Sequence, residues 1–180
     1  MELAARLFSH VCGQVNLCEI RGISLPLCYR CTGLYLGAAL AILLTPIRPR
    51  PAAAVLWVHG IFMLVMLPFG YHLIEHGPLL RLITGQLFGY GLIYYLLLIP
   101  LGESSISSAR GAIVAYFTAA CVGIAILPIA VFYGSQGVAQ TLTTSCLLGL
   151  AVVAILAVTN IALIGRAAIR TILELKKLHS

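Results

Sequence analysis

The sequence predicts an all-α, polytopic membrane protein, and its composition is the first observation that points there. Of its 180 residues, 61% are hydrophobic and only 9% are charged, and the mean hydropathy is +1.06. A soluble domain is typically about 45–50% apolar and about 25% charged. A soluble globule of this composition would expose large apolar patches, and a disordered chain requires low hydrophobicity. Both classes are therefore excluded.

The second observation is the length of the apolar segments, since a membrane-spanning helix needs about 20 mainly apolar residues. Five segments meet this length: 23–47, 52–74, 82–101, 111–133 and 141–164. The breaks between them carry turn and charged residues, such as Arg48-Pro49-Arg50-Pro51. Loops this short place consecutive helices next to each other and antiparallel. We expect residues 1–180 to form one membrane domain, with a five-helix bundle over residues 23–164.

The two flanking segments differ from the spans in their charge pattern. Glu2 and Arg6 interrupt residues 1–22, and no apolar core precedes a cleavage site, so this segment does not resemble a signal peptide. We expect it to be an interfacial segment that carries cysteines. In residues 165–180 the basic residues are spaced as in an interfacial amphipathic helix, although a plain cytoplasmic stop signal is an equal alternative.

The net charge of +6 is explained by where the basic residues lie. They gather at the ends of the apolar segments, so we expect the lipid bilayer to be the partner and expect no nucleic-acid binding. One side of the bundle receives seven of them: Arg48, Arg50, Arg110, Arg166, Arg170, Lys176 and Lys177. The positive-inside rule then predicts a multi-pass protein of the cell membrane, with its N terminus outside and its C terminus in the cytoplasm.

Small residues recur at helical spacing on two of the predicted spans. They are Gly33, Gly37 and Ala41 on the first span, and Gly85 and Gly89 on the third. Such faces let membrane helices approach closely. We expect tight packing within the chain, and a homo-oligomer through these faces is the alternative.

Four of the six cysteines fall within twenty residues, at Cys12, Cys18, Cys28 and Cys31. Cys28-Tyr-Arg-Cys31 is a CxxC motif, and such a pair can bind one metal ion or form a disulfide. Cys12 and Cys18 supply a second pair, and His10 lies two residues before Cys12. The intervening Arg30 favours thiolates electrostatically, although an arginine at a span end can also reach lipid headgroups. Cys121 and Cys146 lie within apolar spans and are interpreted as core residues.

A second polar cluster follows the second predicted span, where the sequence reads His72-Leu-Ile-Glu75-His76. Residues four apart share one helix face, so His72 and His76 could bind the same ion. The string also matches the H-x-x-E-H pattern of zinc proteases, in which Glu75 would be the general base. A pair of histidines that merely ends a span is the alternative. The predicted topology brings this cluster and Arg81 to the same membrane face as the cysteines.

The segment Pro26-Leu27-Cys28-Tyr29-Arg30-Cys31-Thr32-Gly33-Leu34-Tyr35-Leu36-Gly37 resembles a family of small prokaryotic membrane proteins, domain-of-unknown-function family 2085. A second segment, which contains Arg81, Thr84 and Gly85, is similar to that family's second motif. The resemblance implies that Arg30, Thr32 and Gly33 support the site. Cys12-Gly13-Gln14 lacks the histidine of the family's upstream motif, so His10 would have to replace it. The family has no established activity to carry over.

Three functions remain open. The leading hypothesis is a thiolate-rich metal site at one membrane face, with Cys12, Cys28 and Cys31 as ligands and with Cys18, His10, His72 or His76 completing the set. Zinc is the default ion, and copper or iron are alternatives. The second hypothesis is an enzyme, a membrane thiol–disulfide oxidoreductase that uses the same four cysteines and a quinone. The third is a transporter or channel component, which the lack of charge within the spans disfavours.

Overall fold

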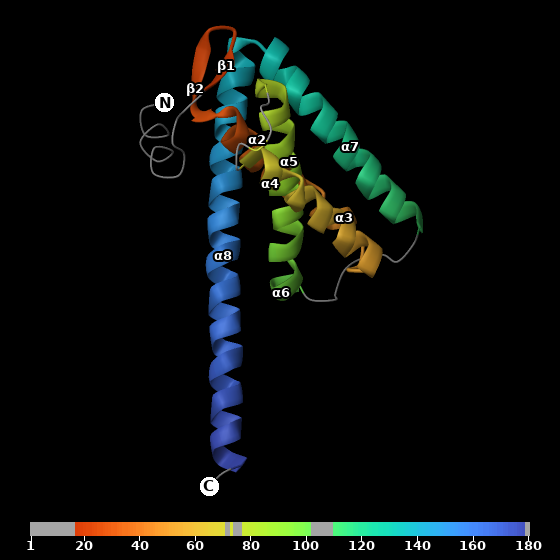
Figure 1. The fold of residues 1–180 in the computed structure, drawn as a ribbon, viewed down its shortest axis with the longest axis vertical. Coiled ribbons are helices and arrows are strands. Elements are labelled where there is room, and N and C mark those ends of the chain that lie inside the picture. The colour runs from red at the N-terminus through yellow and green to blue at the C-terminus, as the bar shows by residue number, and fades with distance from the viewer. Residues whose placement is uncertain (1–16, 71–72, 74–76, 102–109, 179–180) are drawn as a thin grey trace.

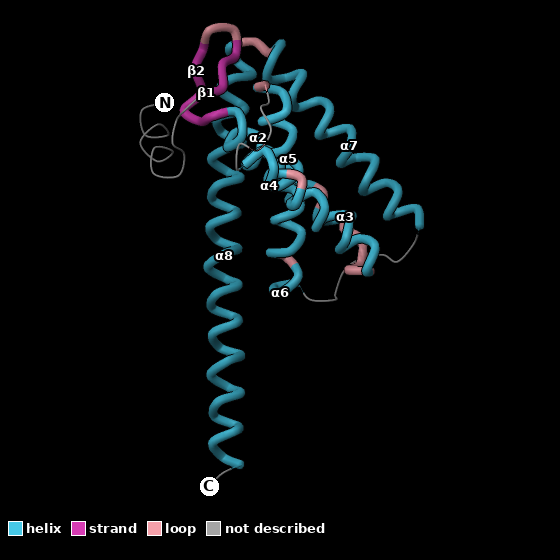
Figure 2. The backbone as a smooth tube through the Cα atoms, in the orientation of Figure 1, coloured by secondary structure: helices cyan, strands magenta, loops and turns pink. Residues whose placement is uncertain are grey.

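A computed structural model describes residues 17–70, 73, 77–101 and 110–178 of the chain. The elements are β1 (Leu17–Ile20), β2 (Ile23–Cys28), α2 (Tyr29–Leu43), the 3-10 turn η1 (Thr45–Ile47), α3 (Ala53–Leu64), α4 (Met66–Gly70), α5 (Pro78–Leu96), α6 (Leu98–Leu101), α7 (Arg110–Tyr133) and α8 (Gln136–Leu178). Figure 1 shows β1 and β2 at one end of the molecule, which we call the hairpin end, and α8 extending far beyond the other helices toward the C terminus. Figure 2 shows that helices make up nearly all of the rest. The mostly helical architecture that the sequence predicts is thus confirmed, with a small hairpin added to it.

The hairpin occupies the start of the first predicted span. In β2 the side chains alternate, and Leu25 and Leu27 are buried while Pro26 and Cys28 are partly exposed. This period of two is typical of a strand and not of a helix. The helix that follows, α2, has 15 residues and is about 22 Å long, which is shorter than the roughly 30 Å hydrocarbon layer.

The five predicted spans are only partly confirmed. Among the described residues, three helical segments are long and apolar enough to cross a membrane: Pro78–Leu101, Gly111–Tyr133 and Gln136–Leu175. The apolar helices Tyr29–Leu43 and Ala53–Phe69 are shorter. The last segment has 40 residues and is about 60 Å long, roughly twice the thickness of the hydrocarbon layer. The segment after residue 164, which carries the basic residues, is therefore part of α8, and this helix runs unbroken to Leu178.

Pro100 explains the break between α5 and α6, and a side chain of α8 provides the hydrogen bond that is lost there. Pro100 has no backbone N–H, so the carbonyl of Leu96 loses its donor within the helix. The Nδ2 of Asn160 on α8 donates to this carbonyl at 2.8 Å. Asn160 is 6% exposed, and this bond is a polar anchor between α8 and the end of α5. It satisfies a backbone group that an apolar environment would otherwise leave unpaired.

The glycines of α2 and α5 face each other. A Cβ on Gly33 or Gly37 would overlap the carbonyl oxygens of Leu82 and Gln86, and one on Gly85 or Gly89 would overlap carbonyl oxygens of α2. The two backbones are therefore in direct contact, which only residues without a side chain permit. The tight packing within the chain that the spacing predicted is present, while a homo-oligomer stays a prediction.

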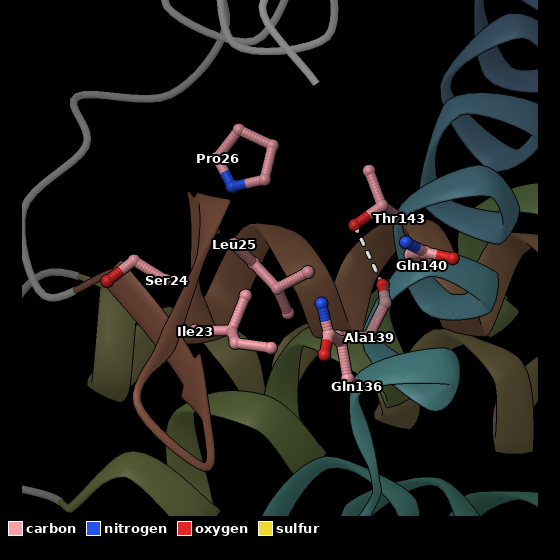
Figure 3. A pocket seen from close by; sticks show the side chains of 8 residues that line it. All are labelled: Ile23, Ser24, Leu25, Pro26, Gln136, Ala139, Gln140 and Thr143. Atoms are coloured by element: carbon pink, nitrogen blue, oxygen red, sulfur yellow. Dashed lines mark hydrogen bonds between the residues drawn. The ribbon is translucent and has the colours of Figure 1, made fainter.

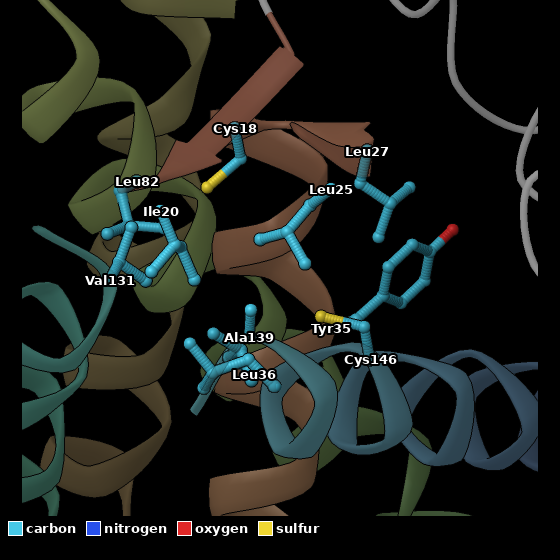
Figure 4. Close-up of a cluster of buried hydrophobic side chains, with 11 residues drawn as sticks. Cys18, Ile20, Leu25, Leu27, Tyr35, Leu36, Leu82, Val131, Ala139 and Cys146 are labelled. Atoms are coloured by element: carbon cyan, nitrogen blue, oxygen red, sulfur yellow. The ribbon is translucent and has the colours of Figure 1, made fainter. Parts of the chain in front are cut away.

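Two groups of buried apolar side chains form the core. The first lies between the hairpin, α2, α8 and the end of α7, and Figure 4 shows Cys18, Leu25, Leu27 and Cys146 converging there. The second joins α2, α5 and α7 through Ala38, Tyr90 and other residues. The first group fixes the hairpin against the helices, and this positions the cysteines of the candidate site.

Candidate functional site

A two-residue turn sets the register of the hairpin and so the position of the CxxC motif. Arg21 and Gly22 connect β1 to β2 with φ of +47° and +79°. Positive φ at both central residues is what a type I′ hairpin turn requires. The antiparallel register pairs Leu17 with Cys28, with an irregularity between Leu17 and Glu19. The hairpin thus brings Cys18 of β1 near Cys28 at the end of β2.

Cys28 caps the N-terminus of α2. Its backbone is extended, with φ of −70° and ψ of 159°, and its Sγ accepts a hydrogen bond from the backbone N–H of Cys31 at 3.5 Å. Both cysteines are partly exposed. The N-terminal end of a helix carries a partial positive charge and unpaired N–H groups, which stabilise a thiolate. The two cysteines of the motif are therefore adjacent, and Cys28 occupies the position that favours ionisation.

Cys18 has the opposite environment. It is fully buried in the first core group, and Figure 4 shows it pointing into that group. Burial raises the pKa of Cys18 from 9.0 to about 12, and the neighbouring Thr32 side chain opposes this only in part. Cys18 is therefore a protonated thiol at neutral pH. Cys146 is buried in the same group, 3.8 Å from the Thr32 carbonyl oxygen, as expected of a core residue, whereas Cys121 is exposed on α7.

Arg30 joins the start of α2 to the end of α4. Its Nη2 donates to the carbonyl oxygen of Phe69 at 2.7 Å, so this arginine makes a contact within the protein. Gly85 on α5 leaves room for the Arg30 carbonyl oxygen, because a Cβ there would overlap it. Arg30 thus fixes three elements at the hairpin end of the molecule.

The remaining supporting residues have structural positions. Thr84 donates from its hydroxyl to the Leu80 carbonyl within α5, at 2.7 Å. Thr32 is completely buried beneath the hairpin, and Arg81 is partly buried in the first turn of α5. Gly33 is one of the α2 glycines that contact α5. The structure therefore brings Arg30, Thr32, Gly33, Arg81, Thr84 and Gly85 to the hairpin end.

Four predicted ligands, His10, Cys12, His72 and His76, lie outside the described residues, as does Glu75, the predicted general base. Among the residues that the structure does describe, no three of Cys, His, Asp and Glu are placed to hold one metal ion. Cys28 and Cys31 are adjacent, but Cys18 is buried as a thiol beside them. A complete metal site would thus need ligands from residues 1–16 or 71–76.

A small cavity lies beside the hairpin, between β2 and the first turns of α8. It holds about 120 Å³ and is lined by the apolar residues Ile23, Leu25, Pro26 and Ala139 and by the polar residues Ser24, Gln136, Gln140 and Thr143. Figure 3 shows the Thr143 hydroxyl bonded to the Ala139 carbonyl of its own helix, at 2.9 Å. The cavity contains no ionisable group, so we assign it no chemistry.

Comparison with known proteins identifies the part of the chain that carries this site. Residues 17–95 match the family described as predicted membrane protein (DUF2085). This is the family predicted from the motifs. The DUF2085 region includes the hairpin, α2 and nearly all of α5, and therefore Cys18, Cys28, Arg30 and Cys31. No curated protein and no solved structure matches the chain.

The DUF2085 region also contains the buried polar residues Arg48, His59 and Gln86. Arg48 is 2% exposed, although it lies in the predicted break between the first two spans. His59 is fully buried, stacked on Tyr94 with ring centroids 3.9 Å apart, and its Nε2 is 3.0 Å from the Tyr116 hydroxyl. Gln86 is also fully buried. The recurrence of Gln86, Tyr90 and Tyr94 every four residues was the signal, because it places polar atoms on one face of an apolar helix.

Proposed function

We propose that this membrane protein catalyses thiol–disulfide exchange, with Cys28 as the attacking thiolate and Cys31 as the resolving thiol. The observation that carries the proposal is the Cys28 Sγ at the N-terminus of α2, which accepts the Cys31 N–H at 3.5 Å. A thiolate in a CxxC motif at a helix start has a lowered pKa and remains nucleophilic at neutral pH. Partial exposure of both cysteines supports access by a substrate.

The proposed reaction uses a disulfide of another protein as the co-reactant. The Cys28 thiolate attacks one sulfur of that disulfide, so a mixed disulfide forms and the other sulfur leaves as a thiolate that takes up a proton. The Cys31 thiol then loses its proton and attacks the Cys28 Sγ. The Cys28–Cys31 disulfide forms and the second substrate thiol leaves. The substrate disulfide gains two electrons and two protons, and the CxxC pair is oxidised; the steps are reversible.

Cys18 does not serve as an attacking group in this proposal, because its buried thiol has a pKa of about 12. The nearby charge of Arg30 supports the thiolate of Cys28 instead, since Arg30 lies two residues further along the first turn of α2. The same proposal can be extended by a disulfide relay through Cys12, with a quinone as the final electron acceptor.

Equilibration of the full-length protein with glutathione redox buffers tests the proposal. Thiols are counted by alkylation and mass measurement of the intact protein. We expect the wild type and the matched control Cys121→Ser to lose two alkylatable thiols as the buffer becomes oxidising, and Cys28→Ser not to do so. Cys31→Ala should accumulate one glutathione on Cys28. Permanent reduction of all thiols across the buffer range would contradict the proposal.

A metal site is the second candidate, and the hydrogen bond from Arg30 to the Phe69 carbonyl favours it. This bond holds the end of α4 against the start of α2, and His72 follows Phe69 by three residues in the sequence. A site with Cys28 and Cys31 as two ligands, zinc as the default ion, and further ligands from residues 1–16 or 71–76 is the proposed arrangement. Elemental analysis separates the candidates: stoichiometric metal that Cys28→Ser removes and Cys121→Ser retains would favour the metal site.

A further inference from the structure

The strongest unexplained feature of the molecule is the guanidinium group of Arg48. This residue follows η1, is 2% exposed, and its Nε, Nη1 and Nη2 have no hydrogen-bond partner among the described residues. The guanidinium carbon lies over the face of Tyr94, 5.6 Å from the ring centroid. Arginine carries five N–H donors and stays charged at every ordinary pH. A buried cation with no acceptor is costly, and within a membrane bundle such a residue marks a functional site.

The protein holds this side chain in place from several directions. The Arg48 backbone N–H donates to the Thr45 carbonyl at 3.1 Å, which closes η1. The Tyr94 hydroxyl donates to the carbonyl of Pro49 at 3.5 Å, so the turn is attached to α5. Tyr94 also stacks on His59 of α3. Contacts with η1, α3 and α5 therefore position Arg48, and none of these contacts uses a guanidinium N–H.

The neighbouring polar groups do not neutralise the charge. His59 lies close to Arg48, but its ring nitrogens are 2.8 Å from the Val55 carbonyl and 3.0 Å from the Tyr116 hydroxyl. The two acidic residues that the structure describes, Glu19 in β1 and Glu174 near the end of α8, make no bond to Arg48. The acceptor for Arg48 is thus not among the described parts of the chain.

We propose that Arg48 anchors a binding site for a phosphate group. The guanidinium fork matches the oxygens of a phosphate and binds them through two parallel N–H donors. Arg48 lies just beyond the end of the apolar helix α2, and its guanidinium lies against Tyr94 of the apolar segment Pro78–Leu101. Arg50, two residues further on, is exposed and is not assigned to the site. Two sources could supply the phosphate, a phospholipid headgroup or a free phosphate ion.

The test uses the full-length protein in nanodiscs, with two probes. One is phosphatidylglycerol added to a phosphatidylcholine bilayer, and the other is inorganic phosphate added to the phosphatidylcholine bilayer alone. Binding is measured by native mass spectrometry of the retained lipid and by the shift of the unfolding temperature. The variants are Arg48→Gln and the more conservative Arg48→Lys, with Arg50→Gln as the matched control.

We expect wild type and Arg50→Gln to bind one of the probes, and Arg48→Gln to bind it about ten- to a hundredfold more weakly, as for loss of hydrogen bonds to a charged group. Arg48→Lys should bind with intermediate affinity, because it keeps the charge and loses the fork. A response to phosphatidylglycerol alone assigns the site to a lipid, and a response to inorganic phosphate assigns it to the free ion.

Two results would overturn the proposal. The first is binding of both probes that is equal in the wild type, Arg48→Gln and Arg48→Lys. The second concerns Glu103, which lies outside the described residues. If Glu103→Gln lowers the unfolding temperature as much as Arg48→Gln, and the double variant lowers it no further, then this carboxylate is the partner of Arg48. The site would then be an internal ion pair and not a phosphate site.

Discussion

The contact between α2 and α5 predicts that a single methyl group at Gly37 will strongly destabilise the protein. A Cβ on Gly37 would lie 2.8 Å from both the Cα and the carbonyl carbon of Gln86, and would overlap the Gln86 carbonyl oxygen. Ordinary contacts of a Cβ begin at 3.4 Å, so the helices must separate by more than half an ångström over this turn. All these atoms belong to the backbone, so no side chain can rotate away.

Overpacking of a core costs about 1–3 kcal/mol, and a clash with backbone on both helices belongs at the upper end of that range. We therefore expect Gly37→Ala to lower the free energy of unfolding by about 3 kcal/mol, roughly a hundredfold in the folding equilibrium constant. Gly165→Ala is the matched control, because a Cβ there meets no atom within 4 Å. Its effect should stay below about 1 kcal/mol and be stabilising, from helix propensity alone.

The assay is unfolding of the purified protein in mixed micelles with increasing mole fraction of a denaturing detergent, followed by circular dichroism. The unfolding midpoint of Gly37→Ala should move well below that of the wild type, and that of Gly165→Ala should stay at or slightly above it. Equal midpoints for the two variants would refute the direct backbone contact between α2 and α5.

Three further predictions concern single side chains. At pH 8 the thiolate fraction of Cys18 should be about a thousandfold below that of a thiol with the ordinary pKa of 9.0, because the pKa of Cys18 is about 12. A water-soluble maleimide should therefore label Cys28 and spare Cys18. Equal labelling rates for the two cysteines would contradict this. Arg30→Gln should lower the free energy of unfolding by about 1.5–3 kcal/mol, since the charged bond to the Phe69 carbonyl is lost, and a detergent-unfolding midpoint equal to the wild type would argue against that bond. Gln86→Met should be neutral or stabilising by about 1–3 kcal/mol in the same assay, because both amide atoms of Gln86 are buried without a partner; a loss of stability would indicate that Gln86 has one.

The sequence predicted the membrane class and the helix contacts well because both depend on local composition. Hydropathy alone identified the segments that became α5, α7 and α8. The four-residue spacing of Gly33, Gly37, Gly85 and Gly89 indicated a face on which helices approach closely, and the contact of α2 with α5 uses these residues. Neither inference needs knowledge of the tertiary structure, since each follows from residues on one helix.

The start of the first span was predicted less well, because hydropathy does not separate a buried strand from a buried helix. Residues 23–28 are apolar enough for either. The structure has a strand here: Arg21 and Gly22 form a two-residue turn, and Leu25 and Leu27 are buried while the residues between and after them are partly exposed. The sequence signal for the turn is a glycine between two short apolar segments. The high hydropathy of residues 23–47 nevertheless favoured a continuous helix.

The environment of each polar residue could not be predicted, since it depends on contacts between distant segments. Cys18 and Cys28 have similar sequence neighbourhoods, but β1 buries the first in the core and β2 leaves the second at the start of α2. Arg48 and Arg50 alternate with prolines in one loop, and only Arg48 turns into the bundle. Predictions that treat the cysteines or the loop arginines as equivalent groups do not capture these differences.

The contact between α2 and α5 also connects the two proposed sites, which lie at opposite ends of α2. At the hairpin end, Gly85 accommodates the carbonyl of Arg30, next to the Cys28 cap. At the other end, Tyr94 of α5 lies against the Arg48 guanidinium. A shift of α2 relative to α5 would therefore disturb the Cys28 environment and the Arg48–Tyr94 contact together. We expect Gly37→Ala, at a temperature where it is still folded, to change both the alkylation rate of Cys28 and phosphate-dependent stabilisation. A change confined to one end would indicate that the two ends of α2 move independently.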